Sequence, residues 1–181
     1  MGDSMSIILQ GSTSGSITLQ EPAVAGSNTL TMPARTGNVM VDGPAFSAYQ
    51  SSQQTISFGS NTKIQLQTEE FDTNNNFDNT TNYRFTPTVA GYYSVTGCVS
   101  ANVSGATYSQ SLLYKNGSAV AGSLQNLNIG PYNGFIAQKL IYMNGTTDYL
   151  EVYFVSIGTG TFTVITGAVA TYLQAVLVRG A

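Results

Sequence analysis

Short segments in which apolar and polar residues alternate, separated by turn-forming residues, recur along most of this chain. The longest is Gly91–Asn102, and the dipeptide Asn116-Gly117 separates two further segments. Alternation with a period of two is typical of strands with one buried face, and Asn-Gly favours the left-handed backbone of tight hairpin turns. A second such pair, Asn144-Gly145, predicts another turn of this kind.

These segments predict an all-β chain folded as an antiparallel jelly-roll sandwich, because many strands without covering helices leave few other architectures. No segment has the periodicity and length of a helix. We expect longer strands at 45–50, 62–71, 83–85, 91–102, 108–115, 134–143, 148–155 and 172–179, with shorter ones at 56–58 and 162–165.

The composition is poor in charge for a chain with enough apolar residues to build a core. Charged residues make up 8% of the 181 residues and hydrophobic residues 42%, whereas the usual charged share is about 25%. Uncharged polar surfaces of this kind are common on extracellular and virion proteins. The net charge of −3 and six scattered basic residues provide no basic face, so we expect no nucleic-acid partner.

The types of residue present argue against an enzyme. The chain has no histidine, which removes the commonest general base and a common metal ligand. Glu69 and Glu70 are neighbours in a strand-like segment, so they should point to opposite faces and form no acid/base pair. We expect no catalytic residues and no resident cofactor. The single cysteine, Cys98, lies in an alternating segment and should be a small buried hydrophobe.

One weak candidate for a metal site lies in an Asn-rich segment. Asp72 and Asp78 stand at its start and near its end, and carboxylates among amide and backbone oxygens suit a hard cation such as Ca²⁺. The spacing matches no EF-hand loop, and a solvated polar loop is the simpler interpretation.

The chain divides near Gly43–Pro44 into residues 1–43 and a head of residues 44–181. Alternating patches in the first part are too short to form a sheet alone. Because apolar side chains are costly to leave in water, we expect an extended arm that pairs with another subunit or a larger assembly. A partly disordered tail is the alternative. The residues expected to anchor the arm are Ile17, Leu19, Leu30 and Met32.

The N-terminal segment has no basic region followed by an adequate apolar region, so no secretory signal is expected. No run of apolar residues approaches the 18 or more that a membrane span requires. We therefore expect no membrane partner.

Two motifs give the head a family resemblance. Pro-Ala-Phe-Ser-Ala at 44–48 is followed by Phe-Thr-Pro-Thr-Val-Ala-Gly-Tyr-Tyr at 85–93. In order and spacing they resemble the globular-head family of complement and tumour-necrosis-factor-like proteins, and Lys-Asn-Gly at 115–117 is similar to a hairpin of that family. The resemblance implies a jelly roll that assembles as a homotrimer.

A homotrimer needs apolar surface beyond what one sandwich buries. Apolar residues of the later strands, together with the first tyrosine of the Tyr-Tyr pair, are the candidates for a threefold interface: Tyr92, Tyr149, Val152, Phe154, Leu173 and Val176.

The N-terminal part carries a second resemblance. Gly-Ser-Ile-Thr-Leu at 15–19 and Pro-Ala-Val-Ala-Gly-Ser-Asn-Thr-Leu-Thr-Met-Pro at 22–33 are similar to sequences of tailed-bacteriophage fibre and virion surface proteins. This implies a structural protein of the virion surface, assembled in the host cytoplasm, with the major capsid protein or other virion proteins as partners. Capsid decoration is the first expectation. A short tail fibre or fibre-tip adhesin for a host receptor or surface glycan is the alternative.

Overall fold

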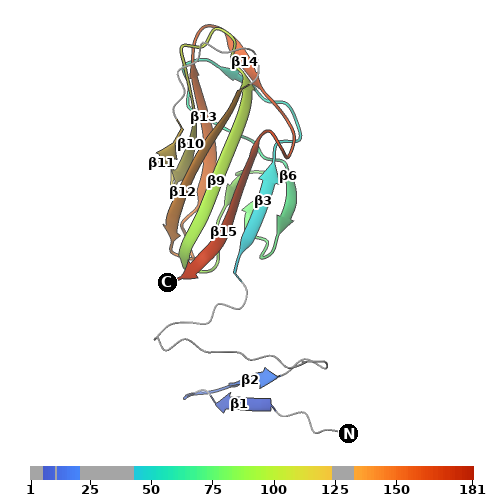
Figure 1. Cartoon of the computed structure of the whole chain (residues 1–181), viewed down its shortest axis with the longest axis vertical. Helices are drawn as coiled ribbons and strands as arrows, with labels where there is room; N and C mark the ends of the chain where they lie inside the picture. Colours follow the sequence, from blue (N-terminus) through green and yellow to red (C-terminus); the bar gives the residue numbers. More distant parts are fainter. Residues whose placement is uncertain (1–5, 11, 21–42, 124–132) are drawn as a thin grey trace, which may run out of the picture. The chain divides into compact units, whose positions relative to one another are not determined.

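The chain forms two compact units, Met1–Gly37 and Asn38–Ala181. The structure, a computed structural model, describes residues 6–10, 12–20, 43–123 and 133–181. These residues form strands, turns and loops without a helix (Figure 1). Accordingly, no helix within the described ranges could cross a membrane. The predicted head, residues 44–181, falls within the second unit.

The first unit contains a hairpin of two antiparallel strands, β1 (Ser6–Gln10) and β2 (Ser16–Gln20). β2 coincides with one of the alternating patches of the sequence. Gly15 precedes it with φ of 77°, a backbone conformation that glycine adopts readily. Leu30 and Met32 lie outside the described residues, so their expected anchoring role stays a prediction.

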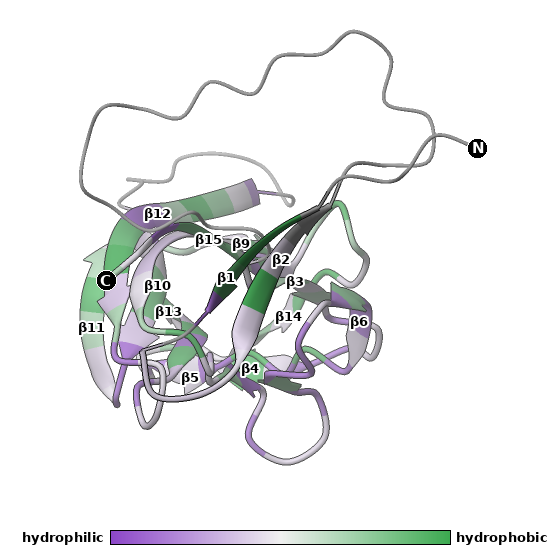
Figure 2. Cartoon of the chain, turned by 90° about the horizontal axis from the view of Figure 1, so that it is seen from below, coloured by the Kyte–Doolittle hydropathy of each residue, from purple (hydrophilic) through white to green (hydrophobic). Residues whose placement is uncertain are grey.

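The second unit is a sandwich of two antiparallel sheets, seen from the side in Figure 1 and end-on in Figure 2. In the first sheet the order is β4-β14-β9-β15-β3-β6, with β12 paired to β9, and in the second it is β11-β10-β13-β8-β7, with β5 paired to β13. The first sheet consists of β3 (Ala45–Tyr49), β4 (Thr55–Ser57), β6 (Thr68–Asp72), β9 (Gly91–Asn102), β12 (Asn133–Met143), β14 (Thr161–Val164) and β15 (Tyr172–Gly180). The second consists of β5 (Thr62–Lys63), β7 (Phe77–Asp78), β8 (Arg84–Phe85), β10 (Tyr108–Lys115), β11 (Ser118–Gly122) and β13 (Leu150–Ile157).

The core lies between the two sheets because one set of alternating side chains from each sheet points inward. Phe46 of β3 stacks on Phe77 and Phe85 of the second sheet, with ring centroids 5.0 and 4.2 Å apart. Gly97 of β9 lets side chains of the second sheet approach its backbone closely, because a Cβ there would lie 2.8 Å from the Leu113 side chain. Aromatic stacking and close packing therefore join the sheets at the centre of the sandwich.

Most predicted strands are present, and two coincide with the structure at both ends, Gly91–Asn102 and Tyr108–Lys115. The single strand expected at 62–71 was wrong. This segment forms β5, which pairs with β13 of the second sheet, and then β6, which pairs with β3 of the first. Between them, Ile64 and Leu66 are fully buried, so the chain crosses from one sheet to the other with its apolar side chains in the core. β7 and β11 were not expected.

The two Asn-Gly pairs have different roles. Asn116 and Gly117, with φ of 51° and 77°, form the predicted two-residue turn between β10 and β11. Asn144-Gly145 instead connects β12 of the first sheet to β13 of the second, so the expectation of a tight hairpin there was wrong. The Asn144 Oδ1 accepts hydrogen bonds from the amides of the next turn, at 3.0 Å from the nitrogens of Thr146, Thr147 and Asp148.

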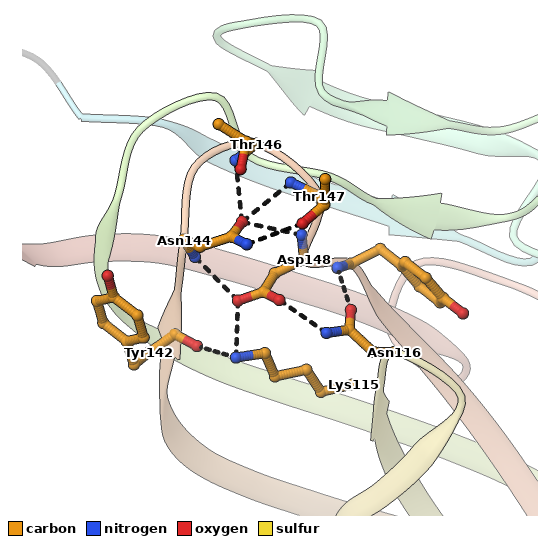
Figure 3. A network of polar contacts seen from close by, with 8 residues as sticks. Lys115, Asn116, Tyr142, Asn144, Thr146, Thr147 and Asp148 are labelled. Carbon is orange, nitrogen blue, oxygen red and sulfur yellow. Dashed lines mark hydrogen bonds and ion pairs between the residues drawn. The ribbon is translucent and has the colours of Figure 1, made fainter.

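The Asp148 carboxylate links the β10–β11 turn to the connection between β12 and β13 (Figure 3). Its carboxylate accepts hydrogen bonds from Lys115 Nζ at 2.8 Å, from Asn116 Nδ2 at 2.7 Å and from the Asn144 amide at 2.9 Å. Burial raises the pKa of Asp148, but these hydrogen bonds outweigh it and the pKa lies below its usual value. A buried carboxylate with three donors therefore stabilises this end of the sandwich.

Candidate self-association face

The outer side of the first sheet carries large apolar side chains, and no other part of the described chain packs on them. Each of them is at least 42% exposed, although exposed large apolar residues are normally scattered. We call this surface the apolar face; it consists of Phe71 of β6, Tyr92 of β9, Ile136, Leu140 and Tyr142 of β12, and Val176 and Val178 of β15.

The strand register arranges the apolar face in cross-strand rows. At the end of the sheet, Tyr92 of β9 stands opposite Tyr142 of β12, and their rings lie 5.5 Å apart. In the next row, Ser94 lies between Leu140 and Val176, and in the row after that Thr96 lies between Gln138 and Gln174. Apolar rows are thus followed by a row of uncharged polar side chains.

The face is hollowed in two places. A depression of about 620 Å³ is lined by Tyr92, Leu140, Tyr142, Val178 and Arg179. A smaller one of about 290 Å³ lies between Phe71, Thr96, Gln174 and Val176. An uneven surface of this kind can receive side chains from a matching surface.

Few charges lie on or beside the apolar face. The rows of Ser94 and Thr96 contain none. Arg179 of β15 lies opposite Tyr92 in the first row and lines the larger depression. Glu70 of β6 lies at the margin, where it accepts a hydrogen bond from Ser47 Oγ at 2.7 Å. Loss of water from this face would therefore expose few unpaired charges to a low dielectric.

Three of the residues predicted for a threefold interface belong to the core of one protomer. Val152, Phe154 and Leu173 are fully buried between the two sheets, so they have no surface to offer a neighbouring subunit and this part of the prediction was wrong. Tyr149 belongs to the opposite side of the sandwich, where the Arg84 guanidinium lies 4.6 Å from the centroid of its ring.

Tyr92 and Val176, the other two predicted interface residues, lie on the apolar face and are exposed. The remaining members of the face, above all Leu140 and Tyr142 of β12, were not predicted from the sequence. Along β12, Phe135 and Ile141 point inward, whereas Leu140 and Tyr142 point outward. Because both sides of this strand carry apolar residues, the sequence does not show which side is buried.

The opposite, outer side of the second sheet has a different chemistry. Tyr114 and Tyr153 stack with ring centroids 4.0 Å apart, and Lys63 Nζ lies 2.7 Å from Glu151 Oε1. Burial, together with the Glu151 charge, raises the pKa of Tyr153. We call this surface the tyrosine face; it consists of Tyr114, Tyr149 and Tyr153 with Arg84, Lys63 and Glu151.

The acidic residues considered for calcium are acceptors for their own loop. Asp72 accepts from the Phe77 amide at 2.6 Å. Asp78 accepts from the amides of Thr80 and Thr81 at 3.0 and 2.9 Å, and these bonds hold its pKa well below the usual value. Within the described ranges no three acidic, histidine or cysteine side chains gather around a possible metal position. Calcium binding stays a prediction, because the carboxylates of Asp72 and Asp78 already accept hydrogen bonds from their own loop.

Cys98 is buried, as predicted for a small hydrophobe. Its thiol lies 3.3 Å from the carbonyl oxygen of Ala170. Burial raises the pKa of this thiol, so the reactive thiolate is disfavoured.

Comparison with known proteins identifies the fold. No protein-family model matches the chain, and no curated protein sequence matches it. Among solved structures, the TNF protein Eiger from S. frugiperda superposes with a TM-score of 0.61 at 9% identity, covering 77% of this chain and 94% of Eiger. Murine APRIL superposes with a TM-score of 0.59 at 8% identity, over 76% of this chain and all of APRIL.

The globular domain of zebrafish complement 1qA also superposes, with a TM-score of 0.57 at 11% identity, over 77% of this chain and 100% of that domain. The fold is therefore the jelly roll shared by tumour-necrosis-factor-like and complement globular-head domains, as the two head motifs indicated. At such low identities the likeness extends to the fold alone.

Proposed function

We propose that the chain is a homotrimeric structural protein of a tailed-bacteriophage particle. In this proposal it decorates the capsid, its heads face outward from the virion surface, and residues 1–43 anchor it to the major capsid protein or another virion protein. Assembly takes place in the host cytoplasm. No catalytic role and no cofactor belong to the proposal.

The apolar face carries the self-association part of this proposal. Seven large apolar side chains on the outer side of one sheet are about half exposed, so full burial would gain each of them roughly half of the about 1.5–3 kcal/mol expected for a wholly exposed side chain. Rows of uncharged residues beside them would add little desolvation cost. The homotrimer implied by the resemblance of the head to its family would cover such a face on every subunit.

The virion part is supported by the sequence of the N-terminal segment and by the composition. Residues 15–19 and 22–33 resemble bacteriophage surface proteins, and the chain has 15 charged residues among 181, six basic and nine acidic. Light scattering of the full chain should give a stable trimer at micromolar concentration, and a monomer would overturn the homotrimer.

Anchoring is tested on particles. The protein should bind emptied capsids and raise their melting temperature, and removal of residues 1–40 should leave a trimeric head that no longer incorporates. Incorporation of the shortened protein would show that the arm is not the anchor.

A fibre-tip adhesin is the second candidate, and the tyrosine face favours it. Partly exposed tyrosines beside Arg84 and Lys63 combine aromatic surfaces with charged hydrogen-bond donors, which suits a polar ligand such as a surface glycan. Binding to a glycan array by the wild type, lost in Tyr153→Ala, would favour the adhesin. Capsid binding without any glycan signal would favour decoration.

A further inference from the structure

The hairpin of β1 and β2 has one aliphatic side and one mainly polar side. Its register places Leu9 opposite Ile17 and Ile7 opposite Leu19. Residues directly opposite each other in an antiparallel pair lie on the same face. We call this side the aliphatic hairpin face. The other side holds Ile8, Gln10, Ser16 and Thr18.

The described side chains of the aliphatic hairpin face are open to solvent within the single chain. Ile7, Leu9 and Ile17 are 62%, 53% and 66% exposed. A two-stranded hairpin is at best marginally stable in water unless its apolar side is packed against something. The hairpin therefore requires an occupant for this face.

The hairpin is too small to hold a partner by itself. Its two strands contain five residues each, whereas each side of a standard protein interface contributes roughly 20–30 residues. Association of so small a surface needs a high local concentration. Hairpins tethered to a common assembly obtain this from the tether, at an effective concentration of about millimolar.

We infer that the aliphatic hairpin face packs against the same face of the hairpins of the other two subunits, which makes a small three-sided apolar bundle. This inference rests on the proposed homotrimer, which brings three copies together through the heads. Neither strand carries a charged residue, so identical copies approach without like-charge repulsion. In this arrangement Ile17 joins the three arms to one another, and the mainly polar side or the rest of residues 1–43 contacts the virion.

Cysteine trapping in the full chain tests the inference. Cys98→Ala removes the only natural thiol, and Leu9→Cys then places one thiol on the aliphatic hairpin face. Thr18→Cys is the matched control, because Thr18 lies in the same hairpin, is also exposed and belongs to the opposite side. Ile17→Cys is a second probe of the aliphatic side.

Under mild oxidation we expect Leu9→Cys and Ile17→Cys to form disulfide-linked dimers about ten-fold faster than Thr18→Cys, at a rate independent of protein concentration. Equal rates, or a faster Thr18→Cys, in a sample that light scattering shows to be trimeric would overturn the inference and leave the homotrimer standing. A monomer by light scattering would overturn both. An introduced thiol that is alkylated freely in the trimer and protected only in particles would assign this face to a virion protein instead.

Discussion

Both outer faces of the sandwich are formed by the outward residues of alternating strands, but the side chains of one face contact each other while those of the other remain exposed. On the tyrosine face, Tyr114 stacks on Tyr153, and Lys63 pairs with Glu151 at 2.7 Å. On the apolar face, Leu140 and Val176 flank Ser94 and remain exposed. One face is therefore complete within a single chain, while the other carries an apolar surface that a second copy could cover.

This difference shows that exposure of apolar residues is informative only when they share a surface. Ile157 at the end of β13 is 43% exposed and Val176 of β15 is 46% exposed. Ile157 stands alone among polar and aromatic residues of the second sheet, whereas Val176 shares its row with Leu140. Single exposed apolar residues are normal on a monomer, but a row of them indicates an interaction surface.

The largest expected effect is loss of the homotrimer in Val176→Asp. A carboxylate buried in an apolar interface without a partner costs about 3–5 kcal/mol, enough to convert a micromolar trimer to monomer. Ile157→Asp is the matched control, because its exposure is nearly equal and it lies on the second sheet. Light scattering should report monomer for the first variant and trimer for the second. The same mass for both variants would remove the distinction between the two faces.

Much of this fold is predictable from the sequence, because period-two alternation and the Asn116-Gly117 turn depend on neighbouring residues alone. β9 and β10 were predicted at both ends for that reason. β11, whose sequence is Ser-Ala-Val-Ala-Gly, has small residues and weak alternation and was missed. The split of 62–71 between two sheets depends on pairing with distant strands, which local sequence does not specify.

The candidate face was less predictable for a physical reason. Along β15, Leu173 and Leu177 point inward while Val176 and Val178 point outward, so both sides of the strand are partly apolar. Alternation then separates two sets of residues without showing which set is buried. Leu173, Val152 and Phe154 were assigned to the interface for this reason, and their burial between the two sheets shows that the assignment was wrong.

An intermediate effect is expected for the ion pair of the tyrosine face. Glu151 is buried, so removing its partner in Lys63→Met should leave a poorly solvated carboxylate and lower the free energy of unfolding by about 1–3 kcal/mol. Glu151→Gln should cost a similar amount, and the double variant less than the sum of the two. Urea unfolding of all four proteins gives the coupling energy. Because this face is complete within the chain, the oligomeric state should not change.

Additivity of the two single changes would mean that Lys63 and Glu151 act independently despite their 2.7 Å separation. A change in subunit number in either variant would be more serious, since it would place the tyrosine face in an interface as well.

The smallest expected effect is the loss of stability when Asp148, which stabilises the connection between β12 and β13, is replaced, and this loss depends on pH. The folded pKa of Asp148 lies below its usual 3.8 because hydrogen bonds from Lys115, Asn116 and Asn144 outweigh burial. A lowered pKa means that the carboxylate stabilises the fold above pH 3.8, and that this contribution is lost as the pH falls below it. Asp148→Asn should therefore lower the free energy of unfolding by about 1–2 kcal/mol at pH 7, and the deficit should shrink in acid.

Asp78→Asn is the matched control, because the pKa of Asp78 is also lowered, mainly by amides of its own exposed loop. Asparagine accepts the same kind of backbone hydrogen bonds, so its cost at pH 7 should be smaller, below about 1 kcal/mol. Because the pKa of Asp78 lies well below its usual value, this carboxylate stays ionised at pH 3, and its small deficit should not shrink there. Urea unfolding at pH 7 and at pH 3 separates the two cases. A deficit in Asp148→Asn that is the same at both pH values would mean that packing of the side chain, and not its charge, stabilises the connection between β12 and β13.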